Sequence, residues 1–410
     1  MITPRDSIGQ RSETVRRANL AAIATQLHLD GPLSRSELVA RTGLTRSAIR
    51  GLIGEFVAAG LVNEERSDSL GAPGRPSPIV TPNGMSAVAL GLEISVDSLA
   101  AGLIGFAGEV HAAVRVERPR GHLAATEIVA DLVEVATPLL RRAEAGTLMG
   151  VGVAVVGIVR RSDGLVRLAP NLGWRDVPLG EMLAQALGIE VPIFVANDAD
   201  LGVLAEHRRG TARGIEDAFY LAGEVGVGGG ALVDGRPMHG AEGYAGEIGH
   251  LPVNPEGLDC ACGSRGCWET EVGEHALLAA AGRPRDGGPE EVGRLLDAAA
   301  ARDPVALAAF QRVGAWLGVG IASIVNTFNP RLVILGGLFA RIHPHVIGPI
   351  TERLAVRALA ASRELVTIVP AALGADTTLL GAAELAFEPF LSDPAAWLAP
   401  RDGEVHLASA

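Results

Sequence analysis

All three cysteines of this 410-residue chain fall within eight consecutive positions, and one histidine stands ten residues before the first of them. The four residues are His250, Cys260, Cys262 and Cys267. Three thiolates and one imidazole make a closed tetrahedral set, which is typical of a structural Zn²⁺ site. Three unrelated buried thiols are the alternative, because free cysteine packs as a small hydrophobe. The clustering favours zinc, so the chain must fold this loop around one ion.

Two carboxylates flank the predicted zinc ligands. Glu247 lies one helical turn before His250, and Glu269 lies two residues after Cys267. A metal that holds His250 would also fix the direction of both carboxylates. An ordered set of acceptors suits a polyhydroxylated ligand, since buried polar groups must be matched donor to acceptor. The stretch therefore predicts a sugar pocket supported by zinc.

The composition is that of a large globular protein with more than one domain, since 48% of the residues are hydrophobic and 20% are charged. No apolar run approaches the length of a membrane span, and no signal peptide is recognisable at the N-terminus. Clustered thiols also favour a reducing compartment. We therefore expect a cytoplasmic protein with no membrane partner.

Charge is distributed unevenly along the chain, whose net charge is −12. Residues 1–80 contain ten arginines and eight acidic residues, a balance of +2, whereas the remainder contains 25 arginines and 39 acidic residues, a balance of −14. An acidic body repels a polyanion. Any contact with nucleic acid is therefore predicted for the N-terminal segment.

Residues 33–62 carry the pattern of a helix-turn-helix. Ser34 and Glu37 form a capping-box signature at the start of a short helix. A tight turn is predicted around Gly43, after which Thr45 can cap a second helix that runs to about residue 59. Near its N-terminal end, where a recognition helix contacts the major groove, the second helix would expose Thr45, Arg46, Ser47 and Arg50.

A segment that resembles a wing follows the second helix. Short strands at residues 61–62 and 79–80 would flank a Gly- and Pro-rich stretch, with Arg75 between Gly74 and Pro76 at its tip. An arginine held on a rigid tip can enter a narrow minor groove. A small helical interaction domain is the alternative, but the exposed arginines favour DNA. We predict that residues 1–83 form a winged helix-turn-helix DNA-binding domain.

Beyond residue 83, strands and helices alternate, which predicts a mixed α/β domain over residues 84–391. Spacing alone leaves open whether this domain consists of two similar lobes. A loosely structured tail is expected over residues 392–410. Consecutive hairpin strands are expected over 88–103 and 110–116, further strands over 150–156, 193–196, 218–221 and 332–335, and helices over 124–142, 179–187, 304–328, 345–361 and 379–391.

Two stretches of this domain carry candidate ligand contacts. Asn197 and Asp198 follow a strand directly, which is where α/β proteins place ligand chemistry. Asp198 could act as a general base toward a sugar hydroxyl or could cap a helix, and the two roles are compatible. The glycines of residues 226–230 could let backbone amides approach a ligand, although tight strand packing explains them equally well.

Together these segments resemble the ROK family, which contains repressors and sugar kinases. The matching segments are Pro170-Asn-Leu-Gly-Trp174, Ala196-Asn-Asp-Ala199, Gly226-Val-Gly-Gly-Gly230, Gly246-Glu-Ile-Gly-His250, the cysteine loop through Glu269, and Ile334-Leu-Gly-Gly337. The resemblance implies an actin-like fold of the RNase H and hexokinase type, with two α/β lobes and a cleft between them. By position, it implies sugar ligands at Asn197, Asp198, Glu247, His250 and Glu269. It also assigns Zn²⁺ to His250 and the three cysteines.

The sequence departs from the ROK kinases where those enzymes hold ATP phosphates on glycine amides. Ser95 and Val96 stand at the two glycine positions of the first loop, and Asp97 stands at its threonine position. In the second loop, Glu224 and Val225 replace Gly-Thr. Side chains and added negative charge at these positions oppose nucleotide binding. We therefore do not expect an enzyme.

The leading hypothesis is a sugar-responsive transcriptional regulator, similar to the xylose and N-acetylglucosamine repressors of the family. Sugar binding would favour one closure of the lobes and so reposition the DNA-binding modules. Such regulators act as homodimers or homotetramers on palindromic double-stranded operators. The alternatives are a ROK sugar kinase that phosphorylates a hexose with ATP, and a zinc-stabilised scaffold that binds a partner protein.

Overall fold

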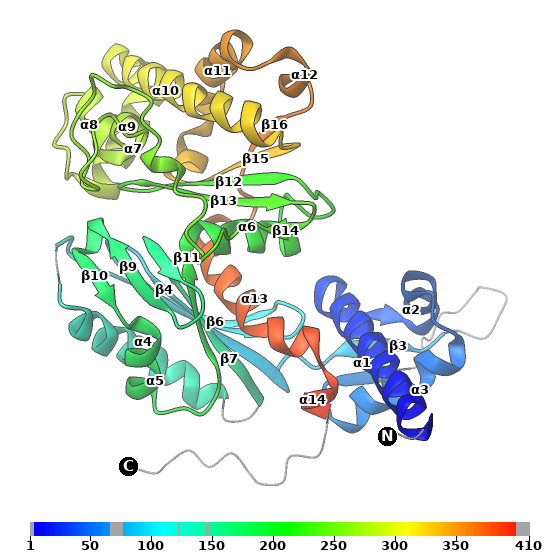
Figure 1. The fold of residues 1–410 in the computed structure, drawn as a ribbon. Coiled ribbons are helices and arrows are strands. Elements are labelled where there is room, and N and C mark those ends of the chain that lie inside the picture. Colours follow the sequence, from blue (N-terminus) through cyan, green and yellow to red (C-terminus); the bar gives the residue numbers. More distant parts are fainter. Residues whose placement is uncertain (1–3, 66–76, 122, 144–146, 399–410) are drawn as a thin grey trace.

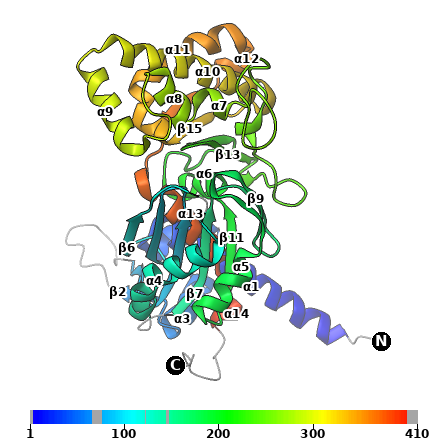
Figure 2. The same ribbon diagram turned by 90° about the vertical axis from the view of Figure 1, so that its left-hand side faces the viewer.

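The computed structural model describes residues 4–65, 77–121, 123–143 and 147–398. Figure 1 shows an N-terminal module beside two α/β lobes, with one long helix, α13, running from the junction of the lobes toward that module. Figure 2 shows the two lobes stacked one above the other, with α6 at their junction and β13 of the second sheet just above it. The predicted wing tip, including Arg75, lies outside the described residues.

The N-terminal module contains the predicted helix-turn-helix. The capping box of Ser34 and Glu37 is formed, Gly43 ends the first helix in the left-handed conformation, and the Thr45 side chain accepts from the backbone N–H of Ala48. A small antiparallel sheet of order β1-β3-β2 completes the module. Its elements are α1 Pro4–Asp30, β1 Leu33–Ser34, α2 Arg35–Thr42, α3 Arg46–Ala58, β2 Val62–Glu65 and β3 Ile79–Pro82.

The first lobe is a five-stranded sheet of order β11-β7-β4-β5-β6 with helices on both faces. Because side chains alternate along a strand, the valines of β7 face α4 and α5, while Gly152 faces α13. A Cβ on Gly152 would lie 1.7 Å from the carbonyl oxygen of Ala382, so glycine lets α13 lie directly on the sheet. The elements are β4 Ala87–Ile94, β5 Ser98–Gly105, β6 Val110–Glu117, α4 Ala125–Ala143, β7 Thr147–Val155, α5 Leu179–Leu187, β11 Ile193–Asn197 and α13 Thr377–Ser392.

The second lobe repeats the strand plan of the first, in the order β14-β13-β12-β15-β16. In each lobe the first three strands pair antiparallel as hairpins, and the first strand also pairs parallel with the fourth, which pairs parallel with the fifth. The domain therefore consists of two similar lobes, a question that the spacing of the sequence had left open. The strands are β12 Ala218–Gly223, β13 Val227–Val233, β14 Arg236–Pro237, β15 Leu332–Gly337 and β16 Thr367–Pro370.

Helices cover the second sheet on its outer side, where α10 packs against α11 over a continuous apolar core. By length and composition, α10 could span a membrane. This finding qualifies the expectation that no apolar run of the chain approaches the length of a membrane span. The apolar residues Val313, Leu317 and Ile321 of α10 are instead fully buried within the lobe. The helices are α7 Glu269–Val272, α8 Glu274–Ala280, α9 Gly288–Ala300, α10 Pro304–Phe328, α11 Leu338–Arg357 and α12 Ala360–Arg363.

Two helices carry the chain between the lobes. Helix α6, Asp198–Arg209, follows the last strand of the first sheet and leads into β12, and α13 returns from β16 to the first lobe. They touch each other closely, since a Cβ on Gly381 of α13 would lie 2.0 Å from the carbonyl oxygen of Leu201 on α6. Both crossovers therefore pack as one pair between the sheets (Figures 1 and 2).

Several predicted boundaries differ from the structure: the run expected over 88–103 is two strands, β4 and β5, and the helix expected to end at residue 361 ends at Arg357. Helix α11 begins at Leu338 rather than at residue 345, and it contains Pro344 and Pro349. Burial of Phe339 and Ile342 holds the first turns in the helix despite Pro344. The expected loose tail also contains a short helix, α14 Ala395–Leu398, and residues 399–410 lie outside the described part of the chain.

Candidate sugar pocket, metal cluster and DNA-binding surface

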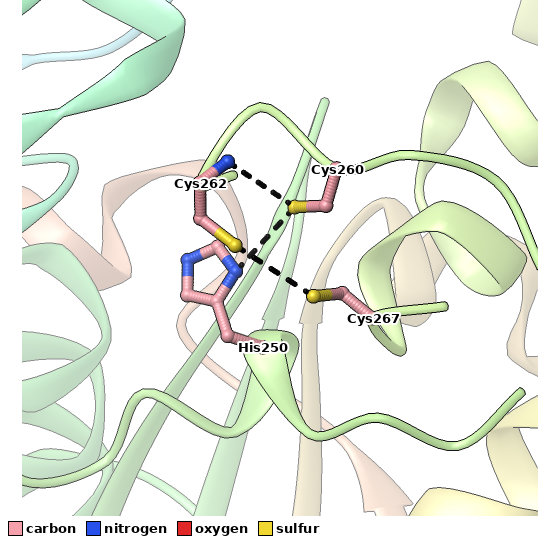
Figure 3. Close-up of side chains that lie close together, drawn as sticks. All are labelled: His250, Cys260, Cys262 and Cys267. Atoms are coloured by element: carbon pink, nitrogen blue, oxygen red, sulfur yellow. Dashed lines mark hydrogen bonds between the residues drawn. The ribbon is translucent and has the colours of Figure 1, made fainter. Parts of the chain in front are cut away.

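The four predicted zinc ligands converge on one point, as Figure 3 shows. Their ligand atoms all lie within 4.8 Å of one another. The Sγ atoms of Cys262 and Cys267 are 3.7 Å apart, and Cys260 Sγ is 3.7 Å from His250 Nδ1. A tetrahedral ion with Zn–S bonds of about 2.3 Å requires ligand separations of roughly 3.8 Å. The cluster therefore has the size and the donor set of a four-ligand metal site.

The cysteine loop is anchored to the second lobe beside this cluster. Trp268 is fully buried, and its Nε1 donates to the backbone oxygen of Trp316 on α10 at 2.9 Å. Gly320 makes room for the indole, since a Cβ there would lie 2.1 Å from the ring. Asn254 also donates to Glu271 at 2.6 Å. These contacts fix both ends of the loop, so the ligands are held in place by the protein core.

The five residues assigned to sugar binding line one small pocket of about 70 Å³ between the lobes. They are Asn197, Asp198, Glu247, His250 and Glu269. The structure therefore brings together residues that are up to 72 positions apart in the sequence. Whether they bind sugar stays a prediction at this point.

Asn197 and Asp198 are placed by the start of α6. Asn197 is the N-cap: its Oδ1 accepts from the N–H groups of Ala199 and Asp200, and its Nδ2 donates to the carbonyl oxygen of Gly157 at 3.0 Å. One amide hydrogen of Asn197 is left for a ligand. Asp198 is the first residue of the helix, so the capping role considered for Asp198 is filled by Asn197 instead.

Glu269 connects the pocket to the metal cluster. Its Oε1 accepts from the Cys260 thiol at 2.8 Å and lies 3.6 Å from His250 Nδ1. A Cβ on Gly226 would lie 2.7 Å from Glu269 Oε2 and 3.3 Å from Asn171 Nδ2. A side chain at position 226 would therefore displace this wall of the pocket. The other glycines of the run lie inside β13, where Gly228 and Gly230 pack on α6 and Gly229 packs on Gly246 and Ile248, which supports the strand-packing alternative.

Asn171 was not among the residues predicted for the pocket, although it lines it. It lies in the 3-10 turn Pro170–Leu172, between β9 Leu165–Ala169 and β10 Trp174–Val177. These strands and β8 Ile158–Arg160 form a small sheet of order β10-β9-β8. The signal was present, because Asn171 belongs to one of the segments that resemble the ROK family.

Two carboxyl groups of the pocket have raised pKa values. Burial, together with the nearby charges of Glu93 and Asp200, raises the pKa of Asp198 to about 7. Burial and the charges of Asp198 and Asp200 raise the pKa of Glu247 to about 7. Near neutral pH, each group can therefore donate or accept a proton in a hydrogen bond with a hydroxyl-rich ligand.

The small pocket opens into a larger cleft of about 910 Å³, with which it shares Val156, Asp198, Ala222 and Glu224. Arg120 crosses this cleft. Its guanidinium donates to Asp97 of the first lobe at 2.9 Å and to both carboxylate oxygens of Glu274 on α8 at 2.5 and 3.0 Å. Asp97 lies in the turn that corresponds to the first phosphate loop of the family kinases. In this protein its carboxylate is ion-paired with Arg120.

Helix α3, the predicted recognition helix, presents cations with no ion-pair partner among the described residues. Thr45, Arg46, Ser47 and Arg50 are all exposed. Other arginines of the module are paired with carboxylates, namely Arg16 with Glu55, Arg35 with Glu64 and Arg41 with Asp30. Arg46 and Arg50 make no such pair within the described part of the chain, so they are available to phosphate oxygens or base edges.

Comparison with known proteins identifies the family. The ROK family model matches residues 89–388, which is most of the chain. The protein belongs to the ROK family. A solved ROK family transcriptional regulator, a homologue of the E. coli MLC protein, superimposes with a TM-score of 0.76 over 94% of this chain and 99% of its own, at 24% identity. The two-lobed actin-like fold implied by the sequence is confirmed.

Named ROK relatives fall into two groups. The xylose repressor of Bacillus spizizenii is 27% identical and aligns over 92% of this chain and 97% of its own. The glucokinase of Streptomyces coelicolor is 30% identical, but it aligns over 73% of this chain and 98% of its own. A Streptomyces griseus ROK glucokinase, solved with glucose and AMPPNP, has a TM-score of 0.64 at 29% identity and covers 73% of this chain and 98% of its own.

Proposed function

We propose that this ROK protein is a sugar-responsive, DNA-binding transcriptional regulator that acts as a repressor. One observation carries the proposal: the alignment with xylose repressors spans 92% of the chain, whereas the alignment with glucokinases spans 73%. The longer alignment must include most of the residues that precede the family domain at residue 89. The N-terminal helix-turn-helix is thus a feature that this chain shares with repressors and that kinases of the family lack.

DNA contact is assigned to the exposed N-terminal end of α3 and to Arg75. Arg46 and Arg50, which pair with no carboxylate in the described part of the chain, supply positive charge on a protein whose net charge is −12. The partner is a double-stranded operator, read as a palindrome by a homodimer or homotetramer, because two-fold protein symmetry requires two related half-sites. The protein is assigned to the cytoplasm, where its operator would be.

The effector is a free sugar, of which D-xylose and D-glucose are the first candidates from the names of the relatives. The carboxylates of Asp198, Glu247 and Glu269 would accept from its hydroxyls, and His250 and Asn197 would complete the ring of contacts. A bound Zn²⁺ would orient His250 and stiffen the loop. The ligands of Zn²⁺ would be the His250 imidazole and the Cys260, Cys262 and Cys267 thiolates, with no position left for water.

A sugar kinase is the second candidate, and one observation favours it. The pKa of Asp198, about 7, suits a general base that takes the proton of a sugar hydroxyl. Against it, the cleft turns carry Asp97 and Glu224, and Arg120 bridges Asp97 to Glu274 across the cleft. Negative charge there opposes the ATP phosphates, so we infer that Asp198 serves as an acceptor.

The deciding experiment measures binding of the full-length protein to a duplex from upstream of its own gene by fluorescence anisotropy at one stated salt concentration. Specific binding that D-xylose or D-glucose weakens is expected. ATP-dependent formation of sugar phosphate from a sugar shown to bind would instead favour the kinase. Absence of specific DNA binding and of kinase activity would favour the scaffold alternative.

A substitution separates DNA contact from effector binding. Arg46→Ala should weaken operator binding by about 1–3 kcal/mol if it reads a base, and should leave sugar affinity unchanged. Arg167→Ala, which removes an exposed arginine paired with Asp176 on the first lobe, is the matched control. Equal effects of the two variants on DNA affinity would contradict the assignment of α3.

A further inference from the structure

A buried polar cluster joins the N-terminal module to the two crossover helices. We call His28, Arg208, Arg209 and Glu384 the crossover hub. His28 lies near the end of α1, the two arginines end α6, and Glu384 lies in the middle of α13. His28 is 0% and Glu384 is 1% exposed. A charged group so deep in the protein must keep its partners, because an unpaired buried charge costs several kcal/mol.

The contacts within the hub connect all three helices at once. Glu384 Oε2 accepts from His28 Nε2 at 2.7 Å and from Arg208 Nη1 at 3.2 Å, and its Oε1 accepts from Arg209 Nε. Arg209 Nη1 also donates to the backbone oxygens of His28 at 3.3 Å and Ala107 at 2.8 Å. Burial alone would raise the pKa of Glu384, but its contacts with His28 and the arginines outweigh burial and hold that pKa well below its usual range.

Helix α6 connects the hub directly to the sugar pocket. Its first residue is Asp198, and its last is Arg209. Twelve residues of α-helix span about 18 Å, so one rigid element reaches from the pocket to the N-terminal module. The far end is tied down further by Glu206, fully buried, whose Oε1 accepts from the N–H groups of Ala372 at 2.9 Å and Leu373 at 3.1 Å, in the segment between β16 and α13.

Any rotation of one lobe against the other must act on α6 and α13, because these helices are the connections between the lobes. Near the hub, the same two helices meet the core of the N-terminal module. Ala205, Leu380, Ala383 and Phe387 share one apolar cluster with Leu20, Ile23 and Leu27 of α1. The same cluster contains Ala89, Ile104 and Met149 of the first sheet, so the module rests on the first lobe and on the two helices that lobe closure moves.

We propose that the crossover hub transmits lobe closure from the sugar pocket to the DNA-binding module. The proposal rests on the proposed function, and it adds the residues through which sugar and DNA binding are coupled. His28, Arg209 and Glu384 are positioning residues, because they lie outside the lining of the sugar pocket and outside α3. Their contacts give α1 a fixed orientation relative to α6 and α13 in each state of the lobes.

The test compares three forms of the full-length protein: the native protein, Glu384→Gln, and Arg17→Ala as the control. Gln keeps the shape of Glu384 and removes its charge. Arg17→Ala breaks a 2.9 Å ion pair between α1 and Asp393, which also links the module to the C-terminal region but lies outside the hub. The Kd for the duplex from upstream of the protein's own gene is measured with and without saturating D-xylose or D-glucose. Sugar Kd is measured by calorimetry.

In the native protein and in Arg17→Ala, sugar should change DNA affinity by about 5- to 150-fold. In Glu384→Gln, sugar and DNA should each still bind, but sugar should change the Kd for DNA by no more than about twofold. Because coupling is reciprocal, the effect of DNA on the sugar Kd should shrink equally. Arg209→Lys should behave in the same way, since lysine keeps the charge but cannot hold Glu384 and two backbone oxygens together.

Unchanged coupling in Glu384→Gln overturns the proposal, as does a folded variant that loses sugar or DNA binding outright. If Glu384→Gln does not fold, Arg209→Lys decides by the same readouts. A native protein whose DNA affinity neither sugar changes contradicts the proposed function itself. If sugar changes DNA affinity equally in the native protein and in the hub variants, only the role of the hub is contradicted.

Discussion

The two lobes repeat one strand order, yet they place different chemistry at equivalent positions. The turn between the first two strands of the first sheet carries Asp97, which is paired with Arg120. The corresponding turn of the second sheet carries Glu224, which has no cation partner among the described residues, and burial in the cleft with nearby acids raises its pKa to about 8. The shared topology fixes where the turns meet, and the side chains decide what they can bind.

The lobes also differ in how they order their inserted segments. The first lobe uses a small hydrogen-bonded sheet, β10-β9-β8, whereas the second uses the cysteine loop gathered at His250. The small sheet is held by continuous strand pairing, whereas the cysteine loop has two isolated bridges and scattered backbone hydrogen bonds, so a metal would contribute more to the order of the loop. We therefore expect the second lobe to depend on metal and the first lobe to be independent of it.

The largest expected effect tests this dependence. Cys262→Ser should lose the metal and lower the free energy of unfolding by several kcal/mol, because metal binding is coupled to folding of the loop. Metal content by mass spectrometry and hydrogen exchange by peptide will check it. Faster exchange should be confined to the second lobe and to the pocket, and sugar affinity should fall. Equal exchange changes in β8–β10 would remove the contrast between the lobes.

An intermediate effect is expected at Asp198, the contribution of the first lobe to the pocket. Asp198→Asn should weaken sugar binding by about 1.5–3 kcal/mol, since a hydrogen bond to a charged acceptor is lost. In the native protein, sugar affinity should rise with pH through about 7 as Asp198 loses its proton. Calorimetry between pH 5.5 and 8.5 measures both. A pH profile unchanged by the substitution would exclude Asp198 as the titrating acceptor.

Two further substitutions sharpen the comparison of the two turns. The pKa of Glu224 is raised to about 8, so the folded protein binds more protons than the unfolded chain above the ordinary value of 4.5. Stability should therefore fall as pH rises from about 4.5 through 8, and Glu224→Gln should flatten that fall. Asp97→Asn should lower the thermal midpoint slightly, because Arg120 loses one of its two partners. Both are measured by thermal unfolding across this pH range.

Local rules predicted the elements whose signals are contained in a short stretch. The capping box at Ser34, the cap at Thr45 and the helix from Pro304 to Phe328 were found because capping side chains and proline act over three or four residues. The metal cluster was found because its cysteines are neighbours in sequence. The start of α11 was missed because tertiary burial of Phe339 overrides the local effect of Pro344.

Contacts between distant segments that no family motif carries were beyond sequence reasoning. The sequence gives no signal that Arg120 meets Glu274, 154 positions away, or that His28 meets Glu384, 356 positions away. Such pairs depend on how the lobes and the N-terminal module pack. Asn171 is intermediate between the locally signalled elements and the distant contacts. Its segment was recognised in the sequence, but its position beside Gly226 in the pocket wall is seen only in the structure.

The shared core of the N-terminal module and α13 has a consequence for protein engineering. Phe106, Phe387 and Phe390 form edge-to-face ring contacts beneath α1, and all three are at most 1% exposed. Removal of residues 1–83 would uncover these rings together with the charge of Glu384. The truncated chain would therefore be prone to aggregate rather than resemble a kinase of the family. A functional exchange of DNA-binding modules between such regulators would require the facing side of α13 to be exchanged as well.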